Sequence, residues 1–589
     1  MTGERVEYAP YQEVASLHPQ ITRERFQRSV QLVETDGSVY EGAEAVFRAL
    51  AHAPFRGWAL WAYLHIPFAR VLSERLYRIV AGHRVGFSRM TRWLWGSSVE
   101  SPSHILTRWI YLRLLGGIFL VAFISLGLQA KGLMGENGIL PAGRLLEAVS
   151  ASVQGSERFT RFPTLCWLSP GDDLVQLLWV SGAALSLLLI LDFAPGPILV
   201  LLWACYLSLA TVSGVFLNFQ WDILLLEAGF LSILLAPWKL LPGLHRDTEP
   251  SRVMLWLLRF LLFRLMFASG VVKLASRDPS WWDLSALTRH YETQPLPTWI
   301  GWYAHQLSPS LQKASCAVMF FIELVVPFLI FLPRRPRLVA FTLFAAFQVL
   351  IGLTGNYCFF NLLTIALSVL LLDDTLVARL FPAAMRAQSD SPKSPGFSRW
   401  LRAPAVAALV AVMLPLEVMA LSRCARREIG WPETLRRIEA GVYPFRIVGS
   451  YGLFSVMTTT RSEIVVEGSN DGTTWLEYEF KWKPGDLGRR PAFVEPHQPR
   501  LDWQMWFAAL GEFRSNPWFQ NFLVRVLQGS PDVLGLLEKN PFPGSPPRYV
   551  RAVLYEYHFT DAGQRRKSGA WWRREWKGLY CPPIGLKKG

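Results

Sequence analysis

The feature that most constrains the fold is a series of long apolar segments separated by short polar or basic stretches. A helix needs about 20 mainly apolar residues to cross the hydrocarbon core of a bilayer. Seven segments approach that length: 109–127, 174–191, 197–217, 253–275, 314–332, 338–353 and 403–421. Because a spanning segment must satisfy its own backbone hydrogen bonds, these runs predict a mainly α-helical polytopic membrane protein.

Two further apolar segments, 223–236 and 359–372, are shorter than a full span. Each crosses the bilayer if neighbouring residues extend it, and otherwise enters and leaves on the same side. Both alternatives are open, so we predict about nine transmembrane or re-entrant helices. The composition agrees, because 51% of the 589 residues are hydrophobic, which is high for a soluble chain.

The positions of Lys and Arg predict the orientation of the chain in the bilayer. If all nine segments cross, three basic loops share a side with the arginine-rich amino terminus; they contain Lys239, Arg246 and Arg252, then Arg334, Arg335 and Arg337, then Arg379, Arg386, Lys393, Arg399 and Arg402. Basic loops favour the cytoplasmic side, so we expect loops 128–173 and 276–313 on the other side, with the region after 421. This bias accounts for the net charge of +15. The predicted partner is therefore the lipid bilayer and not a nucleic acid.

The carboxyl-terminal region has the pattern of a soluble domain. Residues 463–483 alternate between apolar and polar on both sides of Asn470-Asp471-Gly472, which predicts a β-hairpin. Residues 549–560 alternate in the same way, and 503–510 and 518–527 are typical of helices. We predict a cytoplasmic segment at 1–108, a membrane core at 109–421 and an extracytoplasmic β-containing (α+β) domain at 422–589.

The end of this domain, 565–580, mixes tryptophans with Lys and Arg. Such a mixture suits a bilayer interface, where tryptophan rings and cations both gather. Equally, the tryptophans can fold back onto the domain and leave the basic residues in water. Both interpretations are open.

Two carboxylates, Asp222 and Glu227, begin an otherwise apolar segment, where an unpaired charge is costly. Counting about 1.5 Å per residue from the segment ends brings Glu227, Arg264 and Glu323 near one level, and we predict that they form a buried cluster. Two roles are open: the cluster joins helices, or it belongs to a polar cavity with a function. The wider predicted polar cluster is Asp222, Glu227, Arg264, Lys273, Glu323, Gln348, Asn356 and Asn361.

The loop 278–305 is rich in aromatic residues. Aromatic side chains at a membrane edge are most often interface residues, but a loop of this length can also contact a client protein or lipid. The predicted contact surface is Trp281, Trp282, His290, Tyr291, Trp299 and Trp302.

The six cysteines are widely spaced and form no CxxC pair, so no zinc or dithiol motif is predicted. Cys424 and Cys581 bracket the carboxyl-terminal domain on the predicted outer side, where disulfides can form, and their pairing is a hypothesis. The chain also lacks HExxH and GxSxG strings. We predict no catalytic residue, no metal and no cofactor, and favour a non-enzymatic role.

Several long strings resemble the lipase maturation factor family over about residues 109–559: NFQWDILLLEAGFL, GNYCFFNLLTIAL, PRLDWQMWFAAL and PRYVRAVLYEYHF. The resemblance implies a multi-pass protein of the endoplasmic reticulum membrane that helps secreted dimeric lipases to fold and assemble. We therefore predict a membrane-bound maturation factor with a secreted client, in particular a lipase. The helical core also resembles, distantly, the membrane carboxylases that act on glutamate with a quinol. The alternative is thus an integral membrane enzyme with a lipid-soluble substrate.

Residues 26–84 resemble the rear half of a DCC thiol-disulfide oxidoreductase domain. The active cysteines of that family lie in a front-half motif, whereas this chain has no cysteine before Cys166. Redox activity is therefore not carried over by the resemblance. A fused segment of this kind favours a bacterial-type chain in a cytoplasmic membrane over the endoplasmic reticulum location that the family implies.

Overall fold

A computed structural model describes residues 5–53, 57–96, 102–153, 155–243, 248–380, 398–426 and 429–586. It forms two compact units, Met1–Glu100 and Ser101–Gly589. The predicted membrane core and the carboxyl-terminal domain thus belong to one unit. Of the basic residues used to predict orientation, Arg246, Arg386 and Lys393 lie outside the described residues.

Unit 1 is a small α/β arrangement in which two short antiparallel strands pair Leu32 with Tyr40. The helix after the second strand packs on the next two helices, and Ala43, Ala45 and Tyr63 are buried there. Its elements are α1 (Tyr11–Val14), α2 (Arg23–Arg28), β1 (Gln31–Val33), β2 (Val39–Glu41), α3 (Gly42–Ala51), α4 (Gly57–His65), α5 (Ala69–Gly82) and α6 (Arg84–Trp95).

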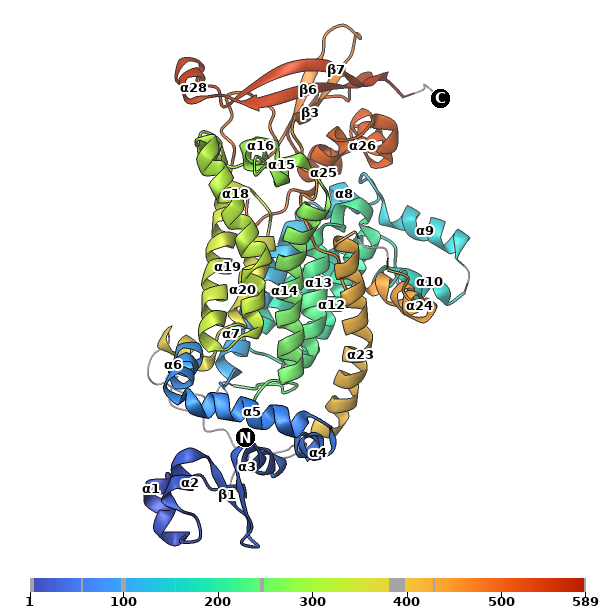
Figure 1. The fold of residues 1–589 in the computed structure, drawn as a ribbon. Coiled ribbons are helices and arrows are strands. Elements are labelled where there is room, and N and C mark those ends of the chain that lie inside the picture. The colour runs from blue at the N-terminus through green and yellow to red at the C-terminus, as the bar shows by residue number, and fades with distance from the viewer. Residues whose placement is uncertain are drawn as a thin grey trace. The chain divides into compact units, whose positions relative to one another are not determined.

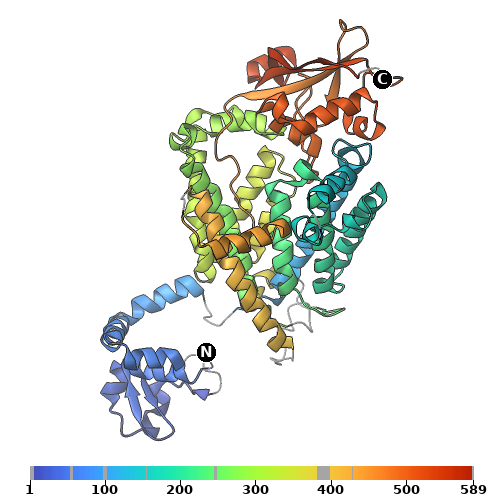
Figure 2. The ribbon, with the colours of Figure 1, turned by 90° about the vertical axis from the view of Figure 1, so that its right-hand side faces the viewer.

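Unit 2 contains a helix bundle with a five-stranded sheet beyond one of its ends (Figure 1; Figure 2 turns the view by 90°). In the described residues, seven helices are long and apolar enough to cross a membrane, which confirms the multi-pass helical fold. They are α7 (Ile105–Gly127), α11 (Asp172–Ile190), α12 (Pro195–Val212), α14 (Arg252–Ala275), α18 with its 3-10 continuation η6 (Pro309–Phe331), α19 (Arg334–Thr354) and α23 (Ser398–Cys424).

The short helix α13 (Gln220–Leu235) connects the two ends of the bundle. Asp222 in its first turn bonds to Arg500 of the carboxyl-terminal region, at the end of the bundle that faces the sheet. At its other end, the Leu235 carbonyl accepts a hydrogen bond from Arg108, at the start of α7, over 3.5 Å. This segment therefore passes through the bundle and does not re-enter.

The second short helix, α20 (Phe360–Val369), also runs from one end of the bundle to the other. Asn361 in its first turn donates to Glu495 of the carboxyl-terminal region over 3.3 Å. The Leu370 carbonyl, just beyond its last turn, accepts from Arg259, near the beginning of α14, over 2.9 Å. With α13 and α20 included, the helices alternate in direction along the chain.

The remaining helices of the core lie in its connections. Most belong to the long connections at the sheet end of the bundle, as the alternation of helix direction requires. They are α8 (Ala130–Met134), α9 (Ala142–Ser152), α10 (Glu157–Arg161), α15 (Pro279–Trp282), α16 (Leu287–Thr293) and α17 (Trp299–His305), with α21 (Asp374–Val377) at the opposite end.

The carboxyl-terminal sheet has the order β5-β4-β3-β6-β7, and every pair of neighbours is antiparallel. The predicted hairpin is the β3–β4 connection, where Gly472 adopts a positive φ of 76° that suits glycine. The elements are β3 (Arg461–Ser469), β4 (Leu476–Phe480), β5 (Leu537–Lys539), β6 (Tyr549–Phe559), β7 (Trp572–Ile584), α24 (Glu433–Val442), α25 (Arg500–Ala509), α26 (Pro517–Leu527), α27 (Pro531–Leu534) and α28 (Ala562–Ser568).

The basic, tryptophan-rich segment near the chain end folds back onto this sheet. It forms α28 and β7, and β7 pairs with β6 along most of its length. Trp571 and Trp572 are buried, whereas Trp576 remains exposed. Arg573 is exposed, whereas Arg574 is partly buried and donates to Glu477 over 2.8 Å. The fold-back alternative therefore describes the segment.

Candidate functional site

An ion pair joins the first turn of α13 to the first residue of α25. The Arg500 guanidinium donates to both oxygens of Asp222, over 2.9 and 3.0 Å, and both side chains are fully buried. Tyr206 from α12 donates its hydroxyl to the same carboxylate over 2.6 Å. Burial is the largest single effect and lowers the pKa of Arg500, but the Asp222 carboxylate and the neighbouring Tyr206 together raise this pKa above its ordinary value. Bidentate, charge-assisted geometry of this kind is the strongest form of the pair.

A second buried group surrounds Glu227, in the middle of α13. The predicted partner Arg264 from α14 forms an ion pair with it. The other carboxylate oxygen of Glu227 accepts from the Gly449 backbone N–H over 2.7 Å and from the Tyr451 hydroxyl over 2.5 Å. Arg264 also donates to the Gly449 carbonyl over 2.9 Å. A loop from beyond the last membrane helix therefore completes the coordination of both charges.

Gly449 can approach this pair because it has no side chain. A Cβ atom placed there would meet the Tyr451 hydroxyl and, at 2.8 Å, a side-chain carbon of Ile223. Both its backbone N–H and its C=O are used by the buried charges. The close packing of the loop on α13 thus depends on glycine at this position.

A second acid at this level, Glu417 from α23, lies 3.8 Å from Arg264 and is fully buried. Neither of its oxygens has a hydrogen-bond partner among the described residues. Two carboxylates therefore share one guanidinium. Sequence analysis missed Glu417, although a single acid inside the apolar run 403–421 is the same signal that identified Glu227.

Glu323 does not join this cluster, which corrects the prediction. Lys273 from α14 donates to both oxygens of Glu323 over 2.8 Å, and Lys273 is nine residues, about 13 Å, along the helix from Arg264. The depth estimate assumed an α-helix to residue 332, whereas α18 ends at Leu324 and continues as a 3-10 helix. A 3-10 helix rises about 2 Å per residue, so these six residues move Glu323 by about 3 Å towards the sheet end, which is part of the difference.

The three amides predicted for the cluster have separate surroundings, although all are buried. Gln348 faces the Met266 sulfur at 3.8 Å. Asn356 donates to the Ala492 carbonyl over 2.9 Å, and its oxygen accepts from the Val494 N–H over 2.7 Å. The predicted single cavity is therefore divided into distinct groups, and Asn356 belongs to the contact with the carboxyl-terminal region.

Residues 492–500, here called the docking segment, lie against the sheet end of the bundle. The Gln129 side chain donates to the Gln498 carbonyl over 2.7 Å and accepts from the Arg500 N–H over 2.9 Å. Ser125 accepts from the Gln498 N–H over 2.8 Å. The polar side chains of Ser125, in the last turn of α7, and Gln129, just beyond it, replace the water that the backbone of the docking segment would otherwise bind.

Glu495 of the docking segment faces a break between α19 and α20. It accepts from the Tyr357 N–H and from the Asn361 side chain. Burial raises the pKa of Glu495 to about 7, against the lowering effect of these two hydrogen bonds. This carboxyl therefore changes its charge near neutral pH.

The aromatic loop 278–305 is mainly an internal surface, which corrects part of the prediction. Trp281 and Trp302 are each only 2% exposed. Trp281 donates to the Phe454 carbonyl over 3.1 Å, and the buried Arg461 donates to the Glu292 carbonyl over 2.8 Å. The carboxyl-terminal domain thus packs on the loop, and Arg461 of the domain donates hydrogen bonds to backbone carbonyls of the loop.

The other predicted residues of this loop differ in exposure. Trp282 is 64% exposed and can contact a partner. Tyr291 and Trp299 are partly buried, and the Trp299 ring stands edge-on to Phe493. His290 faces the Tyr357 hydroxyl at 3.2 Å, and burial lowers its pKa to about 4, so it is neutral at physiological pH.

The hypothetical disulfide between Cys424 and Cys581 is not formed. Both are free, buried thiols. Cys424 at the end of α23 bonds to the Tyr451 carbonyl, whereas Cys581 lies in β7 opposite Ala552. The positions of the cysteines in the sequence could not show that β7 pairs with β6, which holds Cys581 in the sheet and not at the end of α23.

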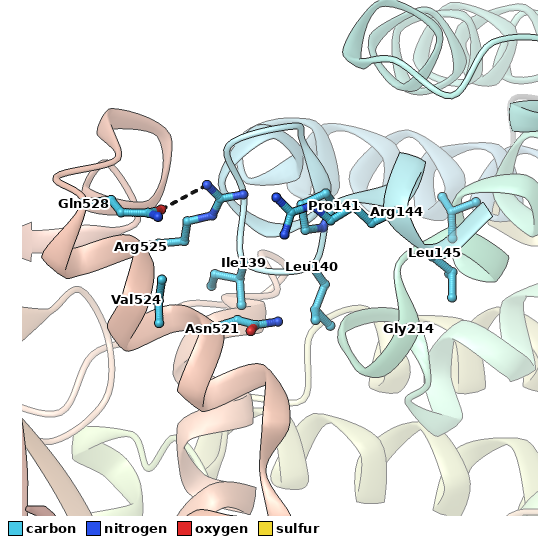
Figure 3. A pocket seen from close by; sticks show the side chains of 11 residues that line it. Ile139, Leu140, Pro141, Arg144, Leu145, Gly214, Asn521, Val524, Arg525 and Gln528 are labelled. Carbon is cyan, nitrogen blue, oxygen red and sulfur yellow. Dashed lines mark hydrogen bonds between the residues drawn. The ribbon is translucent and has the colours of Figure 1, made fainter. Parts of the chain in front are cut away.

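A surface groove of about 340 Å³ lies between the connection after α8 and helix α26. Figure 3 shows Arg525 on one wall and Arg144 on the other, with Leu140 and Asn521 between them. Arg525 is held by the Gly138 carbonyl over 2.9 Å. The groove therefore forms part of the contact between the core and the carboxyl-terminal region.

Comparison with known proteins decides the family. Residues 106–379 match the Lipase maturation factor transmembrane domain, and residues 447–582 match the Lipase maturation factor C-terminal domain. Lipase maturation factor 2 of Gallus gallus is 39% identical over 81% of this chain and 81% of its own length. The chain belongs to the lipase maturation factor family.

Further relatives of this lipase maturation factor family member include Lipase maturation factor 2 of Homo sapiens, 40% identical over 82% of this chain and 83% of its own length. Lipase maturation factor 1 of Mus musculus is 35% identical over 83% of this chain and 90% of its own length. Residues 2–90 match the DCC1-like thiol-disulfide oxidoreductase family, and no solved structure matches the chain. The expected resemblances at both parts of the chain are confirmed.

The buried charges connect the two lipase maturation factor domains. Asp222 and Glu227 lie in the transmembrane domain, and their partners Arg500 and Tyr451 lie in the C-terminal domain. Sequence analysis quoted the string that contains Arg500 but did not single it out, because an arginine in a soluble domain carries no local sign of burial. We call these contacts the domain interface.

Proposed function

We propose that this protein is a membrane-bound maturation factor that assists the folding and assembly of secreted lipases. The observation that carries the proposal is the family membership, which covers both the transmembrane and the C-terminal domain. The curated relatives are named lipase maturation factors. A lipase is therefore the proposed client.

The proposed location of the C-terminal domain is the side of the membrane on which the client folds. The basic residues at the beginnings of α19 (Arg334, Arg335 and Arg337) and α14 (Arg252) support this orientation. They are at the bundle end opposite to the sheet, and basic residues at membrane ends favour the cytoplasm. The membrane is that of the endoplasmic reticulum in a eukaryotic cell and the cytoplasmic membrane in a bacterial one.

The domain interface supports a role as a rigid platform. Asp222, Glu227 and Asn356 hold the C-terminal domain on the membrane core at three places. A client that binds to exposed aromatic side chains of the loop 278–305 is thereby kept at the bilayer surface. Trp282, and Tyr303 with half of its surface exposed, are the proposed contacts.

The enzymatic alternative finds less support in these contacts. An active carboxylate needs a free coordination position towards its substrate. Asp222, Glu227 and Glu323 are instead each paired with a cationic side chain and buried. We therefore assign the pairs to the attachment of helices and domains.

The test compares lipase activity with lipase abundance in cells that lack the gene. The expected result is secreted lipase at normal synthesis but with reduced specific activity, restored by the wild-type gene. Restoration should be weaker with Trp282→Ser and Tyr303→Ser together. The matched control replaces Trp576 and Leu579, which are similarly exposed on β7, with serine. Unchanged specific activity after gene deletion would refute the proposal.

A further inference from the structure

Helix α5 of unit 1 exposes an apolar stripe. Leu72, Leu76, Ile79 and Val80 follow the spacing of one helix face, and each is between 44% and 59% exposed. A helix on the surface of a soluble domain would carry polar residues there. The stripe is therefore a second apolar face that unit 1 itself does not cover.

The opposite face of α5 already packs inside unit 1. Tyr77 accepts from the Val30 N–H over 2.7 Å, and Glu74 accepts from the Tyr63 hydroxyl over 3.1 Å. Glu74 also lies against Gly42, at 3.1 Å from the position of a Cβ atom there. The helix is thus held in this rotation by specific contacts, and its outward stripe is not the core-facing side.

The helices on either side of α5 in the chain also expose large apolar side chains. In α4, Trp58, Trp61 and Phe68 just after it are more than half exposed, and in α6 so are Val85 and Trp93. Tryptophan is the side chain that most favours the boundary between water and lipid. A surface of this extent is larger than isolated apolar residues on a soluble protein explain.

The charged residues of the same segment have one sign on the outside. Six arginines lie in 57–96, all exposed, and the one acid, Glu74, points into unit 1. Arginine beside apolar and tryptophan side chains is the composition of helices that lie in an anionic membrane surface. These arginines are Arg70, Arg75, Arg78, Arg84, Arg89 and Arg92.

The chain itself keeps this surface near a bilayer. Helix α6 ends at Trp95 and the membrane helix α7 begins at Ile105. The residues between them can span at most about 30 Å when fully extended. A lipid surface is therefore always within reach of unit 1.

We propose that α4, α5 and α6 lie in the interface of the anionic lipid leaflet next to the start of α7, with the stripe of α5 inserted among the acyl chains. Arg75, Arg78, Arg89 and Arg92 meet the lipid phosphates while their apolar neighbours enter the hydrocarbon layer. Arg70 lies 3.9 Å from Glu44, and Arg84 donates to the backbone carbonyls of Gln27 and Arg28, so these two arginines stay with unit 1. This inference is independent of the proposed lipase client.

The test uses the full chain in lipid nanodiscs, with an environment-sensitive fluorophore on Leu76→Cys. The native cysteines are buried in the described structure and compete little for the label. Spin-labelled lipids should quench the fluorophore at position 76 several-fold more than at Thr35→Cys, an exposed turn position of unit 1. The quenching should be stronger in discs with phosphatidylglycerol than in discs of phosphatidylcholine alone.

A charge-reversal pair identifies the face. Arg75→Glu with Arg78→Glu should lower the ratio of membrane-bound to unbound unit 1 by about five-fold or more per arginine. Arg23→Glu with Arg28→Glu changes the net charge equally but lies on α2, and should leave quenching at position 76 nearly unchanged.

Three results would overturn the proposal. A shielded fluorophore without lipid quenching means that protein covers the stripe. Equal quenching at positions 35 and 76 means that unit 1 has no preferred face. Equal effects of the two charge-reversal pairs mean that general charge, and not this surface, attracts unit 1 to the membrane.

Discussion

The buried ion pairs of the membrane core fall into two kinds. Asp222–Arg500 and the Glu227 group with Tyr451 connect the core to the C-terminal domain. Lys273–Glu323 connects two helices, α14 and α18, and reaches no residue of that domain through its hydrogen bonds in the described structure. Equally buried ion pairs therefore have different roles. A pair attaches the C-terminal domain or only joins two helices, depending on which element supplies the partner.

Removal of Arg500 should have the largest effect on the attachment of the C-terminal domain. Arg500→Met leaves the Asp222 charge buried without its cation, and the loss of one partner from a buried pair costs about 3–5 kcal/mol. We expect a lower melting temperature together with proteolysis between the core and the C-terminal domain. Thermal unfolding in detergent measures the melting temperature, and limited proteolysis in detergent measures the cleavage.

Arg514→Met is the control for that change. Arg514 is exposed, so this substitution should leave stability and proteolysis unchanged. Adding Asp222→Asn to Arg500→Met should recover part of the stability, because the unpaired charge is then gone. Equal proteolysis of Arg500→Met and wild-type protein would contradict this role of the pair.

Lys273→Met should lower stability by about 3 kcal/mol through the unpaired Glu323. The C-terminal domain should nevertheless stay attached, because its contacts with Asp222 and Glu227 remain. The measurement is the same pair of assays, and a lower melting temperature with unchanged proteolysis is expected. Release of the domain by this variant would remove the distinction between the two kinds of pair.

Tyr451→Phe should have a smaller effect, of about 1.5–3 kcal/mol, because it removes one hydrogen bond to a charged group and keeps the ring. Thermal unfolding in detergent measures the change. Tyr443→Phe is the control, because Tyr443 is 73% exposed. If both variants melt at the same temperature, the Tyr451 hydroxyl contributes nothing to the domain interface.

Glu495→Gln should change the pH dependence of stability. Burial raises the pKa of Glu495 from 4.5 to about 7, so the folded protein holds this proton more tightly than the unfolded chain. The stabilisation is fully present below about pH 4.5 and is lost as the pH rises through about 7. Glutamine keeps an acceptor oxygen, so this variant should be more stable than wild type at pH 8.

At pH 4.5 the Glu495→Gln variant and the wild type should melt at similar temperatures. Glu512→Gln, a change at an exposed acid, is the control at both pH values. If the melting temperatures of wild type and Glu495→Gln change with pH by the same amount, Glu495 is excluded as the titrating group.

Much of the architecture was predictable because it depends on local patterns. The long apolar runs correspond to the seven long helices, and alternation around Gly472 corresponds to the β3–β4 hairpin. Within the candidate site, depth counting placed Glu227 beside Arg264, since both lie in regular α-helix. It failed for Glu323, where the helix changes to a 3-10 form.

Local patterns could not identify the contacts that span the domain interface. The aromatic loop was expected to be exposed, but Trp281 and Trp302 are buried beneath the C-terminal domain. Their composition is the same in either case, because a tryptophan favours a membrane boundary and a protein interface alike. Burial was decided by the domain that packs on the loop.

Local patterns in the sequence were sufficient for the long membrane helices and for β3, β4 and β6, because apolar length and residue alternation act over a few turns or one hairpin. The tertiary structure alone decided which charges meet. Asp222 and Arg500 are 278 residues apart. Their pairing requires that the C-terminal domain returns to the end of the bundle, where the absence of water makes each charge depend on the other.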